Sequence, residues 1–298
     1  MTKPTLSFIG AGTLGTALAR ACAVAGYHVL SIHSHSFEDA NRLANALPGA
    51  EAVSSPTDTT RADIIFLTVP DDAIAAVCES IAWPAACSVV HCSGALSLDV
   101  LNSAAQSGVA TGSFHPLQTF AANGEHAARL SDISYALEAS GKELHDTLQE
   151  LVETLGGRPQ WIASADKPLY HASAAMASNY LVALLGDASQ LWESFGFTRE
   201  SGLQSLLPLV RGTIDNLQGI GFPDALTGPI ARGDIATVRI HIEALIASQP
   251  DIIASYAAMG KRTVTLALEK GTLSEEAAQA MRELLDTAIH PENAHEAG

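Results

Sequence analysis

Short apolar runs alternate with amphipathic stretches through the first half of the chain. The apolar runs predict strands at residues 6–11, 28–32, 50–53, 62–70, 87–94, 109–116, 132–140 and 158–164. The stretches between them predict helices at residues 13–26, 37–47, 71–82, 97–108 and 142–155. The run at 62–70 is apolar without alternation, which is typical of a strand covered on both faces. Strands that alternate with helices predict a parallel, doubly wound α/β sheet.

The pattern changes near Ser164. From there to Leu285, apolar residues recur at helical spacing, which predicts an all-helical second domain. The stretch from His171 to Gly196 is apolar on almost every side, which predicts a buried helix and a homodimer formed through this domain. We therefore expect a nucleotide-binding domain at residues 1–163, a helical substrate and dimerisation domain at 164–290, and a flexible tail at 291–298.

Composition and charge exclude several classes of protein. The 298 residues are 47% hydrophobic and carry a formal net charge of −16 without a basic stripe, so no nucleic-acid partner is expected. No run of 18 apolar residues and no signal-peptide pattern is present, which predicts a cytoplasmic protein without a membrane partner. His33 and His35 have no neighbouring cysteine or carboxylate cluster to complete a metal site, so no metal is expected.

A glycine motif joins the first predicted strand to the first predicted helix. It has the pattern G-x-G-x-x-G and consists of Gly10, Ala11, Gly12, Thr13, Leu14 and Gly15. In a dinucleotide-binding unit the first glycine allows the tight turn, the second admits the pyrophosphate, and the third allows close packing of helix on strand. The strand before the motif and the helix after it favour this interpretation over a glycine-rich turn that binds nothing.

The end of the second predicted strand indicates which nucleotide binds. An NAD site usually has an acidic residue there to hold the ribose 2′-hydroxyl. This chain has no carboxylate in the loop, whose residues are His33, Ser34, His35 and Ser36. Hydroxyl and imidazole groups can donate to a 2′-phosphate, and Ser36 is also placed to cap the next helix. The sequence therefore predicts NADP(H) rather than NAD(H), although the arginine usual at such sites is missing from the loop.

Several motifs together resemble one family. They read FIGAGTLGTAL, IIFLTVPDDAI, HCSGALSLDVL, GSFHPLQTF, LYHASAAMASNYLVAL and LTGPIARGD. The chain is similar to Rossmann-like NADP oxidoreductases with a helical C-terminal domain of unknown function. These are related to deazaflavin-dependent NADP oxidoreductases, pyrroline-5-carboxylate reductases, prephenate dehydrogenases and ketopantoate reductases. The resemblance implies a Rossmann domain followed by an all-α domain similar to the C-terminal domain of 6-phosphogluconate dehydrogenase.

The resemblance implies further contacts with the cofactor. The segment TVPDDAI resembles the loop that passes along the nucleotide, so Val69 and Pro70 would flank the ribose. Asp72 would cap or border the helix that follows. The segment HCSG resembles the loop near the nicotinamide, which would place Ser93 against that ring.

The resemblance also implies residues that bind the substrate. His115, in HPLQTF, matches the histidine of the HPM stretch that lies at the active-site cleft of prephenate dehydrogenases. Thr227 and Gly228, in TGPIARGD, match a helix start that holds a substrate carboxylate in pyrroline-5-carboxylate reductases. Arg232 has no counterpart in that motif and is included as a further candidate for the carboxylate.

The start of the helical domain gathers polar residues on one side. Lys167, His171 and Ser178 lie within about 40° of one another around a helix axis, and Asn179 borders the same face. Hydride transfer to a carbonyl or imine needs a proton donor and polar groups that orient the substrate. We expect Lys167 or His171 to donate the proton, and Ser178 and Asn179 to orient the substrate.

Structural roles for these residues stay open. Lys167 can be a solvated first-turn residue, and His171 a helix histidine satisfied by a backbone group. Tyr170 and Tyr180 are interpreted as core residues.

Together these features predict an NADPH-dependent reductase of a small carboxylate-bearing carbonyl, such as a 2-oxo acid of the ketopantoate type. His171, rather than asparagine, follows Lys167 by four residues, and this departs from the pattern of ketopantoate reductases. An imine reductase of the pyrroline-5-carboxylate type is the close alternative, and a deazaflavin-dependent NADP oxidoreductase is another. A non-catalytic NADP-binding redox sensor represents the other class of function.

Overall fold

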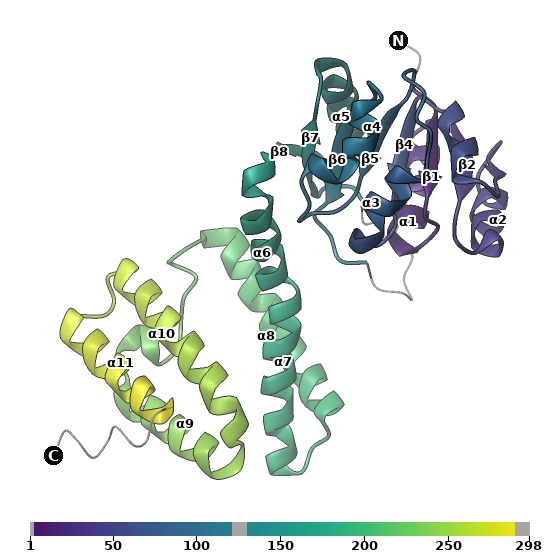
Figure 1. Ribbon diagram of the computed structural model, residues 1–298. Coiled ribbons are helices and arrows are strands. Elements are labelled where there is room, and N and C mark those ends of the chain that lie inside the picture. The colour runs from purple at the N-terminus through teal and green to yellow at the C-terminus, as the bar shows by residue number, and fades with distance from the viewer. Residues whose placement is uncertain (1–2, 121–129, 290–298) are drawn as a thin grey trace. The chain divides into compact units, whose positions relative to one another are not determined.

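The computed structural model describes residues 3–120 and 130–289, and the chain divides into two compact units (Figure 1). The first unit is Met1–Ser178 and the second is Asn179–Gly298. The first unit therefore includes a helix beyond residue 163, where the sequence pattern changes. The expected tail, 291–298, lies outside the described residues.

The first unit contains an eight-stranded sheet. Its strands are β1 (Leu6–Ile9), β2 (Val29–His33), β3 (Glu51–Ala52), β4 (Ile64–Leu67), β5 (Ser88–His91), β6 (Ala110–Pro116), β7 (Ser134–Ala139) and β8 (Arg158–Trp161). Its α-helices are α1 (Thr13–Val24), α2 (Phe37–Asn45), α3 (Asp71–Glu79), α4 (Asn102–Gln106), α5 (Lys142–Thr154) and α6 (Lys167–Ala177). Short 3₁₀ helices are η1 (Pro56–Arg61), η2 (Leu98–Leu101) and η4 (Ser164–Asp166). These elements confirm the predicted alternation of strands and helices.

The strands are ordered β3-β2-β1-β4-β5-β6-β7-β8. The order reverses between β1 and β4, which is the point where doubly wound sheets bind ligands. Strand β7 runs antiparallel to β6, and every other pair in the sheet is parallel. Antiparallel strands need no crossover helix between them, and the sequence predicts none between the strands that became β6 and β7.

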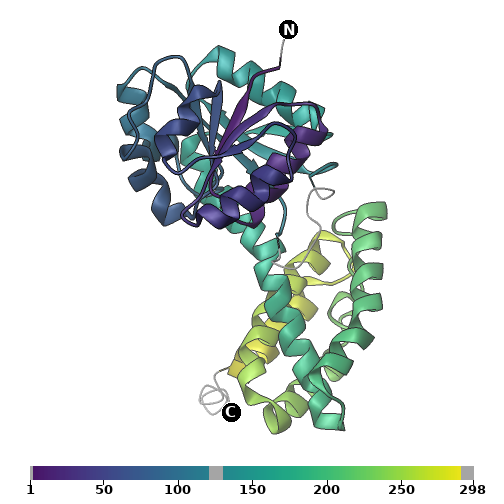
Figure 2. The same cartoon turned by 90° about the vertical axis from the view of Figure 1, so that its right-hand side faces the viewer.

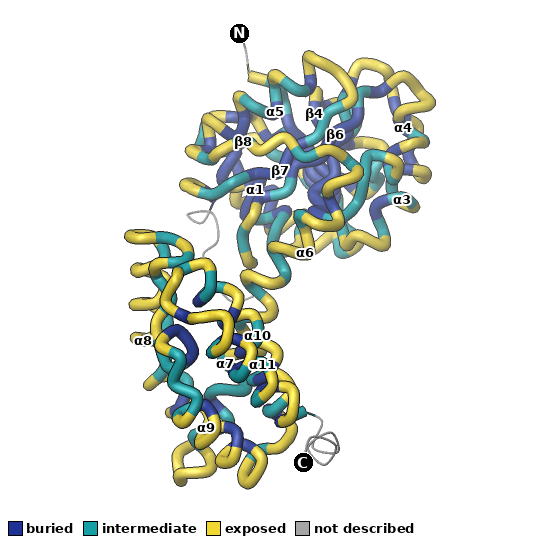
Figure 3. The backbone as a smooth tube through the Cα atoms, turned by 90° about the vertical axis from the view of Figure 1, so that its left-hand side faces the viewer, coloured by how far each residue is buried: buried dark blue, intermediate teal, exposed yellow. Residues whose placement is uncertain are grey.

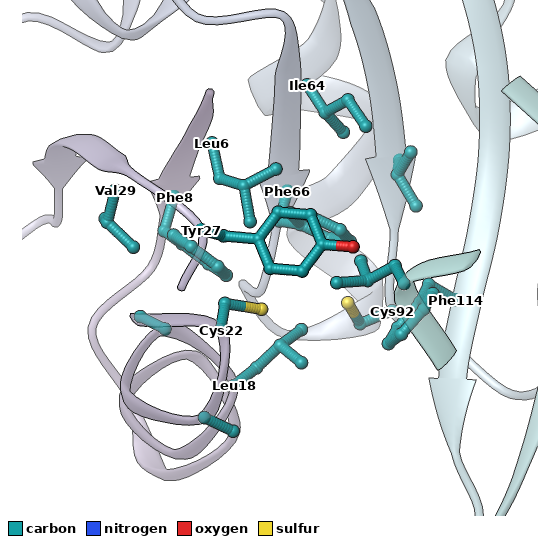
Figure 4. Close-up of a cluster of buried hydrophobic side chains, with 14 of the residues drawn as sticks. Leu6, Phe8, Leu18, Cys22, Tyr27, Val29, Ile64, Phe66, Cys92 and Phe114 are labelled. Carbon is teal, nitrogen blue, oxygen red and sulfur yellow. The ribbon is translucent and has the colours of Figure 1, made fainter. Parts of the chain in front are cut away.

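Helices cover both faces of the sheet (Figures 1 and 2). On one face, α1, α2 and α5 pack on alternate strand residues such as Phe8, Phe66 and Phe114. On the other face, α3, η2 and α4 pack on the residues between them, such as Ile65 and Val89. Because both faces are covered, the central strands read as continuous apolar runs. Figure 4 shows part of the first core, where Leu18 and Cys22 of α1 lie over the sheet.

The second unit is helical. Its helices are α7 (Asn179–Gln190), η5 (Leu191–Phe195), α8 (Arg199–Ile220), η6 (Ile230–Arg232), α9 (Ile235–Ser248), η7 (Pro250–Ile252), α10 (Ile253–Glu269) and α11 (Glu275–Ile289). The apolar stretch from His171 is divided at Ser178, whose φ of −113° and ψ of −71° interrupt the helix between α6 and α7. Within the described residues, no helix has both the length and the apolar character needed to cross a membrane.

The core of the second unit lies among α9, α10 and α11. Fully buried residues there include Val238, Val264 and Leu285. Helices α7 and α8 contribute little to it: their only buried residues are Ser189 and Gly202. Figure 3 shows this difference as long exposed stretches along α8.

Candidate functional site

The carboxyl ends of five parallel strands meet along one edge of the sheet in the first unit. The register places Ile9 beside both His33 and Leu67, and Leu67 beside His91. His91 in turn pairs with Ser113 of β6. The loops after these strands therefore start side by side, and they contain most of the sites that the sequence predicts in this unit.

Two glycines of the G-x-G-x-x-G turn are required by the packing of the protein itself. Gly10 has a φ of +116°, and a Cβ there would lie 2.6 Å from the carbonyl oxygen of Thr68. A Cβ on Gly15 would lie 2.2 Å from the Gly10 carbonyl oxygen. The Thr68 hydroxyl also donates a hydrogen bond of 2.8 Å to that oxygen. Side chains at either glycine would therefore separate α1 from β1 and β4.

Gly12 differs from its two neighbours in the motif. A Cβ at Gly12 would meet no atom of the protein within 4 Å. Gly12 is the N-cap of α1, no side chain caps this end in the described structure, and the first turn holds no acidic residue. The backbone N–H groups of Thr13, Leu14 and Gly15 therefore begin a helix whose N-terminus is open to an anion.

The loop after β2 holds no carboxylate from His33 to Ser36. The half-buried His33 contacts the Val53 carbonyl oxygen through Nδ1 at 3.2 Å. Ser36 accepts a hydrogen bond of 3.3 Å from the Asp39 N–H, so it caps α2 as the sequence predicts. Ser34 is half-buried and His35 is exposed. Arg42, in the last turn of α2, forms an ion pair with Asp39.

The loop after β5 is fixed by Ser93. Its hydroxyl donates to Asp71 Oδ2 at 2.6 Å and accepts hydrogen bonds of 3.2 Å from the N–H groups of Ala95 and Leu96. Ser93 thus joins its own loop to the start of α3, which follows Val69 and Pro70. Asp71, the first residue of α3, binds Ser93, and Asp72 follows it in the first turn of the same helix, which it was expected to cap or border.

Lys167 points into the first unit and is only 1% exposed. Its Nζ donates to the Leu96 carbonyl at 2.9 Å and to the Ser113 hydroxyl at 2.6 Å. The same Nζ lies 3.3 Å from Glu138 Oε2. Burial lowers the pKa of Lys167, and the negative charge of Glu138 opposes that shift. The side chain therefore ties the start of α6 to β6, β7 and the loop after β5, and the alternative of a solvated first-turn lysine is wrong.

His115 and His171 both lie beside Gly94, and His115 also contacts Tyr170. His115 Nδ1 is 2.8 Å from the Tyr170 hydroxyl, and the two rings meet edge to face. A Cβ on Gly94 would lie 2.8 Å from His115 Nε2 and 3.0 Å from His171 Cδ2. The glycine therefore leaves room for two histidines that are far apart in the sequence. The expectation of a core role for Tyr170 is wrong, because the residue is only half-buried.

Two histidines near this edge stay uncharged at neutral pH. Burial, followed by the charge of Lys167, lowers the pKa of His91 to about 3. Burial, followed by the charge of His171, lowers the pKa of His115 to about 4. His91 Nδ1 accepts a hydrogen bond of 3.2 Å from the Ser93 N–H, so the proton of its neutral ring is on Nε2. Each neutral imidazole keeps one donor and one acceptor nitrogen.

The remaining expected site residues lie farther along the chain. Ser178 ends α6, about 16 Å along the helix axis from Lys167 at 1.5 Å per residue, and Asn179 begins α7. A shared helical face therefore does not bring these side chains together at one point.

The segment TGPIARGD lies in the second unit. Thr227 is exposed, and Gly228 has a φ of +99°. The helix that begins after them, η6, has three residues and includes the exposed Arg232. Helix α9, which follows, is capped by the Asp234 side chain, whose Oδ1 accepts from the Thr237 N–H at 3.0 Å.

Sequence reasoning did not identify several residues that shape this edge. Thr68 and Asp71 lie in the same TVPDDAI motif as Val69 and Pro70, so their position was a usable signal. Glu138 lies in a predicted strand, and nothing local indicates its contact with Lys167. The hydrogen bond between Tyr170 and His115 likewise joins segments that are distant in the sequence.

Two family models match the chain. A model described as a Rossmann-like domain matches residues 2–116, and a model described as a domain of unknown function, DUF2520, matches residues 133–263. The chain combines a Rossmann-like domain with DUF2520. The DUF2520 match begins next to β7, so it includes the last strands of the sheet as well as helices of the second unit. No curated protein matches the chain.

Solved structures share the fold over nearly the whole chain. A candidate NADP oxidoreductase from Bacteroides fragilis is 23% identical, with a TM-score of 0.69 over 94% of this chain and 98% of its own. A pyrroline carboxylate reductase from Plasmodium falciparum with NADP bound is 16% identical, with a TM-score of 0.61 over 95% of this chain and 99% of its own. A reductive aminase from Aspergillus terreus, in complex with NADPH and ethyl-5-oxohexanoate, is 16% identical, with a TM-score of 0.59 over 97% of this chain and 95% of its own. At these identities, the likeness is one of fold.

Proposed function

We propose that this Rossmann-DUF2520 protein is an NADPH-dependent reductase of a small carboxylate-bearing substrate with a C=O or C=N bond. The observation that carries the proposal is the open space at Gly12, at the N-terminus of α1 and beside the reversal point of the sheet. Gly10 and Gly15 are explained by the protein's own packing, whereas Gly12 is explained by a ligand that approaches the backbone. A pyrophosphate fits this place because the open N–H groups and the helix dipole favour an anion.

NADP(H) is the nucleotide that the loop after β2 supports. A carboxylate at this position would repel a 2′-phosphate, and His33, Ser34, His35 and Ser36 include none. Val69, Pro70 and Ser93 follow the neighbouring strands and are our further candidates for contact with the nucleotide. When bound, NADPH supplies the hydride, and the chain binds and orients both reactants. The bound NADP and NADPH of two fold neighbours support this choice.

Polar residues beside Gly94 are our candidates for contact with the substrate. His115 and His171 converge there, on the same sheet edge as the glycine turn. Of the two expected proton donors, His171 is exposed, whereas Lys167 is enclosed and fully engaged. We therefore assign Lys167 to positioning the loop after β5, and His171 to the substrate. Ser178 and Asn179 remain candidates for orienting the substrate.

The reducible bond is either a carbonyl, as in a ketopantoate-like 2-oxo acid, or an imine. The activities of two fold neighbours, the pyrroline carboxylate reductase and the reductive aminase, support the imine. Thr227, Gly228 and Arg232 are our candidates for holding the substrate carboxylate. The support for these candidates is the resemblance of TGPIARGD to the helix start that holds a substrate carboxylate in pyrroline-5-carboxylate reductases. The helix that starts there in this chain is only three residues long and adds no support of its own.

The test is consumption of NADPH by the purified chain, followed by nicotinamide absorbance. Ketopantoate and other 2-oxo acids form one arm, and cyclic imines with a carboxylate, such as 1-pyrroline-5-carboxylate, form the other. Turnover in one arm, with NADH a much poorer donor, is the expected result. Tight NADPH binding without turnover in either arm would instead support the redox sensor.

We further propose that two copies associate through α7 and α8. These helices expose apolar side chains, among them Val182 at 70% and Leu209 at 68%. The first eight residues of α7, from Asn179 to Gly186, carry no charge. A second copy offers the same apolar face and would cover both at once. Light scattering should give the mass of a dimer, and Val182→Asp should give a monomer that keeps its helical content. A monomeric wild-type chain at micromolar concentration would exclude this proposal.

A further inference from the structure

We propose that Tyr170 donates the proton to the reduced substrate and that His115 refills it, so that the two side chains form a proton relay. This inference rests on the proposed reductase function and deepens it. The geometric basis is the contact of 2.8 Å between the Tyr170 hydroxyl and His115 Nδ1. The rings lie at 89° to each other with centroids 5.6 Å apart, so each ring fixes the orientation of the other.

The relay lies where a reductase needs it. His115 follows Ser113 by two residues, at the carboxyl end of β6, in line with the ends of β5 and β4. Its Cε1–Nε2 edge faces Gly94, in the loop that Ser93 and Lys167 hold in place. Because Tyr170 bonds to Nδ1, opposite ends of the imidazole face the hydroxyl and the Gly94 loop. The ring can therefore accept a proton at one nitrogen while it delivers one from the other.

The protonation states suit a relay between neutral groups. Burial, followed by the charges of His171 and Lys167, lowers the pKa of His115, and the negative charge of Asp71 acts in the opposite direction. Burial raises the pKa of Tyr170 to about 12, so its hydroxyl keeps its proton at neutral pH. Both an imidazolium and a phenolate are thus disfavoured here. A transfer in which each group gives one proton as it receives another avoids both charges.

The proposed step balances in atoms and electrons. The hydride from NADPH forms a C–H bond at the C=O or C=N carbon, and the π electron pair of that bond moves to oxygen or nitrogen. That atom takes the proton of Tyr170, whose oxygen receives the proton of His115 Nδ1. As Nδ1 gives its proton, Nε2 of His115 takes one from a water molecule, so the ring stays neutral. The products are an alcohol or an amine, NADP⁺ and the hydroxide that the water leaves to the solvent, and exchange with solvent returns the ring proton to Nδ1.

A second tyrosine–histidine pair provides a matched control. In the second unit, the Tyr256 hydroxyl lies 2.9 Å from His241 Nδ1, and the two ring planes meet edge to face at 84°. This geometry closely matches that of Tyr170 and His115. His241 is exposed, whereas His115 is half-buried and beside the glycine loop. The two pairs therefore share the tyrosine–histidine contact and differ in their surroundings.

The experiment measures kcat for four variants with the best substrate of the ketoacid and imine panel: Tyr170→Phe, His115→Gln, Tyr256→Phe and His171→Asn. Tyr170→Phe keeps the ring and should lower kcat by about 100-fold or more, with NADPH affinity unchanged, as expected for loss of a general acid. Tyr256→Phe should retain the wild-type kcat. His115→Gln should lower kcat less than Tyr170→Phe does and should change the solvent isotope effect on kcat.

Equal kcat values for Tyr170→Phe and the wild type would overturn the relay and leave the reductase function intact. Loss of turnover in His171→Asn, with turnover kept in Tyr170→Phe, would also overturn the relay. If the wild type reduces no member of the panel, both the proposed function and the relay fail.

A measurement without substrate tests the pair directly. Nitrogen-15 NMR should show His115 as a neutral ring throughout the range above about pH 5, and Tyr170→Phe should shift its Nδ1 resonance. A His115 ring that is charged at pH 6, or that does not respond to Tyr170→Phe, would contradict the relay.

Discussion

The carboxyl edge of the sheet and the face formed by α7 and α8 differ in how far their side chains find partners within one chain. At the sheet edge, the polar atoms of Ser93 and Lys167 form hydrogen bonds with neighbouring strands and loops. A Cβ added to Gly10 or Gly15 there would lie within 3 Å of a backbone atom. Helices α7 and α8, in contrast, bury only Ser189 and Gly202 and expose large apolar side chains.

The difference indicates what each region needs from outside the chain. The sheet edge has open space at Gly12, and there and at the histidines beside Gly94 we propose that small molecules bind. The α7–α8 face has an excess of apolar area, which a macromolecular surface covers best. Substitutions at the edge should therefore change folding and ligand binding, and substitutions on the face should mainly change association.

The largest expected effect is at Lys167. Lys167→Met removes one partner of a buried ion pair and leaves Glu138 without it, which should lower the free energy of unfolding by about 3–5 kcal/mol. Denaturant unfolding measures this. Lys142→Met is the matched control, because its side chain is 86% exposed in its pair with Asp146, and it should cost at most about 1 kcal/mol. Equal losses in the two variants would remove the contrast between edge and surface.

Next in size is the glycine turn. Gly15→Ala places a Cβ 2.2 Å from a backbone oxygen and should cost about 1–3 kcal/mol of stability, as overpacking does. Gly12→Ala meets no protein atom, so it should leave the melting temperature unchanged and weaken NADPH binding by about 100-fold, or nearly 3 kcal/mol. If Gly12→Ala destabilises the chain as much as Gly15→Ala does, the space at Gly12 is not reserved for a ligand.

The buried histidines of the edge should make stability depend on pH. The pKa values of His91 and His115 lie at about 3 and about 4 in the folded state, below the ordinary value of 6.5. Between these values the unfolded chain binds more protons, so stability falls as the pH decreases. Each imidazole should remove about 2 kcal/mol between pH 7 and pH 5. Thermal unfolding across this range measures the loss, and His91→Asn should reduce its slope.

A smaller effect is expected at the loop after β2. Ser36→Ala removes the side-chain cap of α2 and should cost about 1 kcal/mol of stability. We also expect weaker NADPH binding with NADH binding unchanged, since only NADPH carries the 2′-phosphate. Ser55→Ala removes a similar contact, to the Thr57 N–H at 3.3 Å, and should leave both affinities unchanged. Parallel losses for the two nucleotides would show that Ser36 only caps the helix.

The smallest effect on folding is expected on the α7–α8 face. Val182→Ser changes a side chain that is 70% exposed, so the monomer's free energy of unfolding should change by less than about 0.5 kcal/mol. Val238→Ser, at a fully buried position of α9, should cost several times as much. Dilute samples, in which copies do not associate, are needed for this comparison. A large loss for Val182→Ser would show that α7 packs within the chain.

Most of the fold could be predicted because its signals are local. Apolar runs of strand length, a glycine motif and the cap at Ser36 each act within a few residues, and the structure has elements at all of them. The antiparallel β7 was less accessible, because the direction of a strand depends on the connection rather than on its own residues.

The candidate site was only partly predictable for the opposite reason. Lys167 was placed correctly on a helix start, but its partners Leu96 and Ser113 are 71 and 54 residues away. Helical spacing put Ser178 on the same face as Lys167 and gave no measure of their separation along the axis. Tyr170 and Tyr180 look alike in sequence, yet Tyr170 bonds to His115 and Tyr180 is 65% exposed.

A fluorescence titration of the wild-type chain with NADPH and with NADH tests the proposed nucleotide site most directly. We predict saturable binding of NADPH that is at least about tenfold tighter than that of NADH, a difference of about 1.4 kcal/mol. Equal affinities, or tighter binding of NADH, would contradict the assignment of the His33–Ser36 loop. Absence of binding for both nucleotides would contradict the proposal that the open turn at Gly12 holds a dinucleotide.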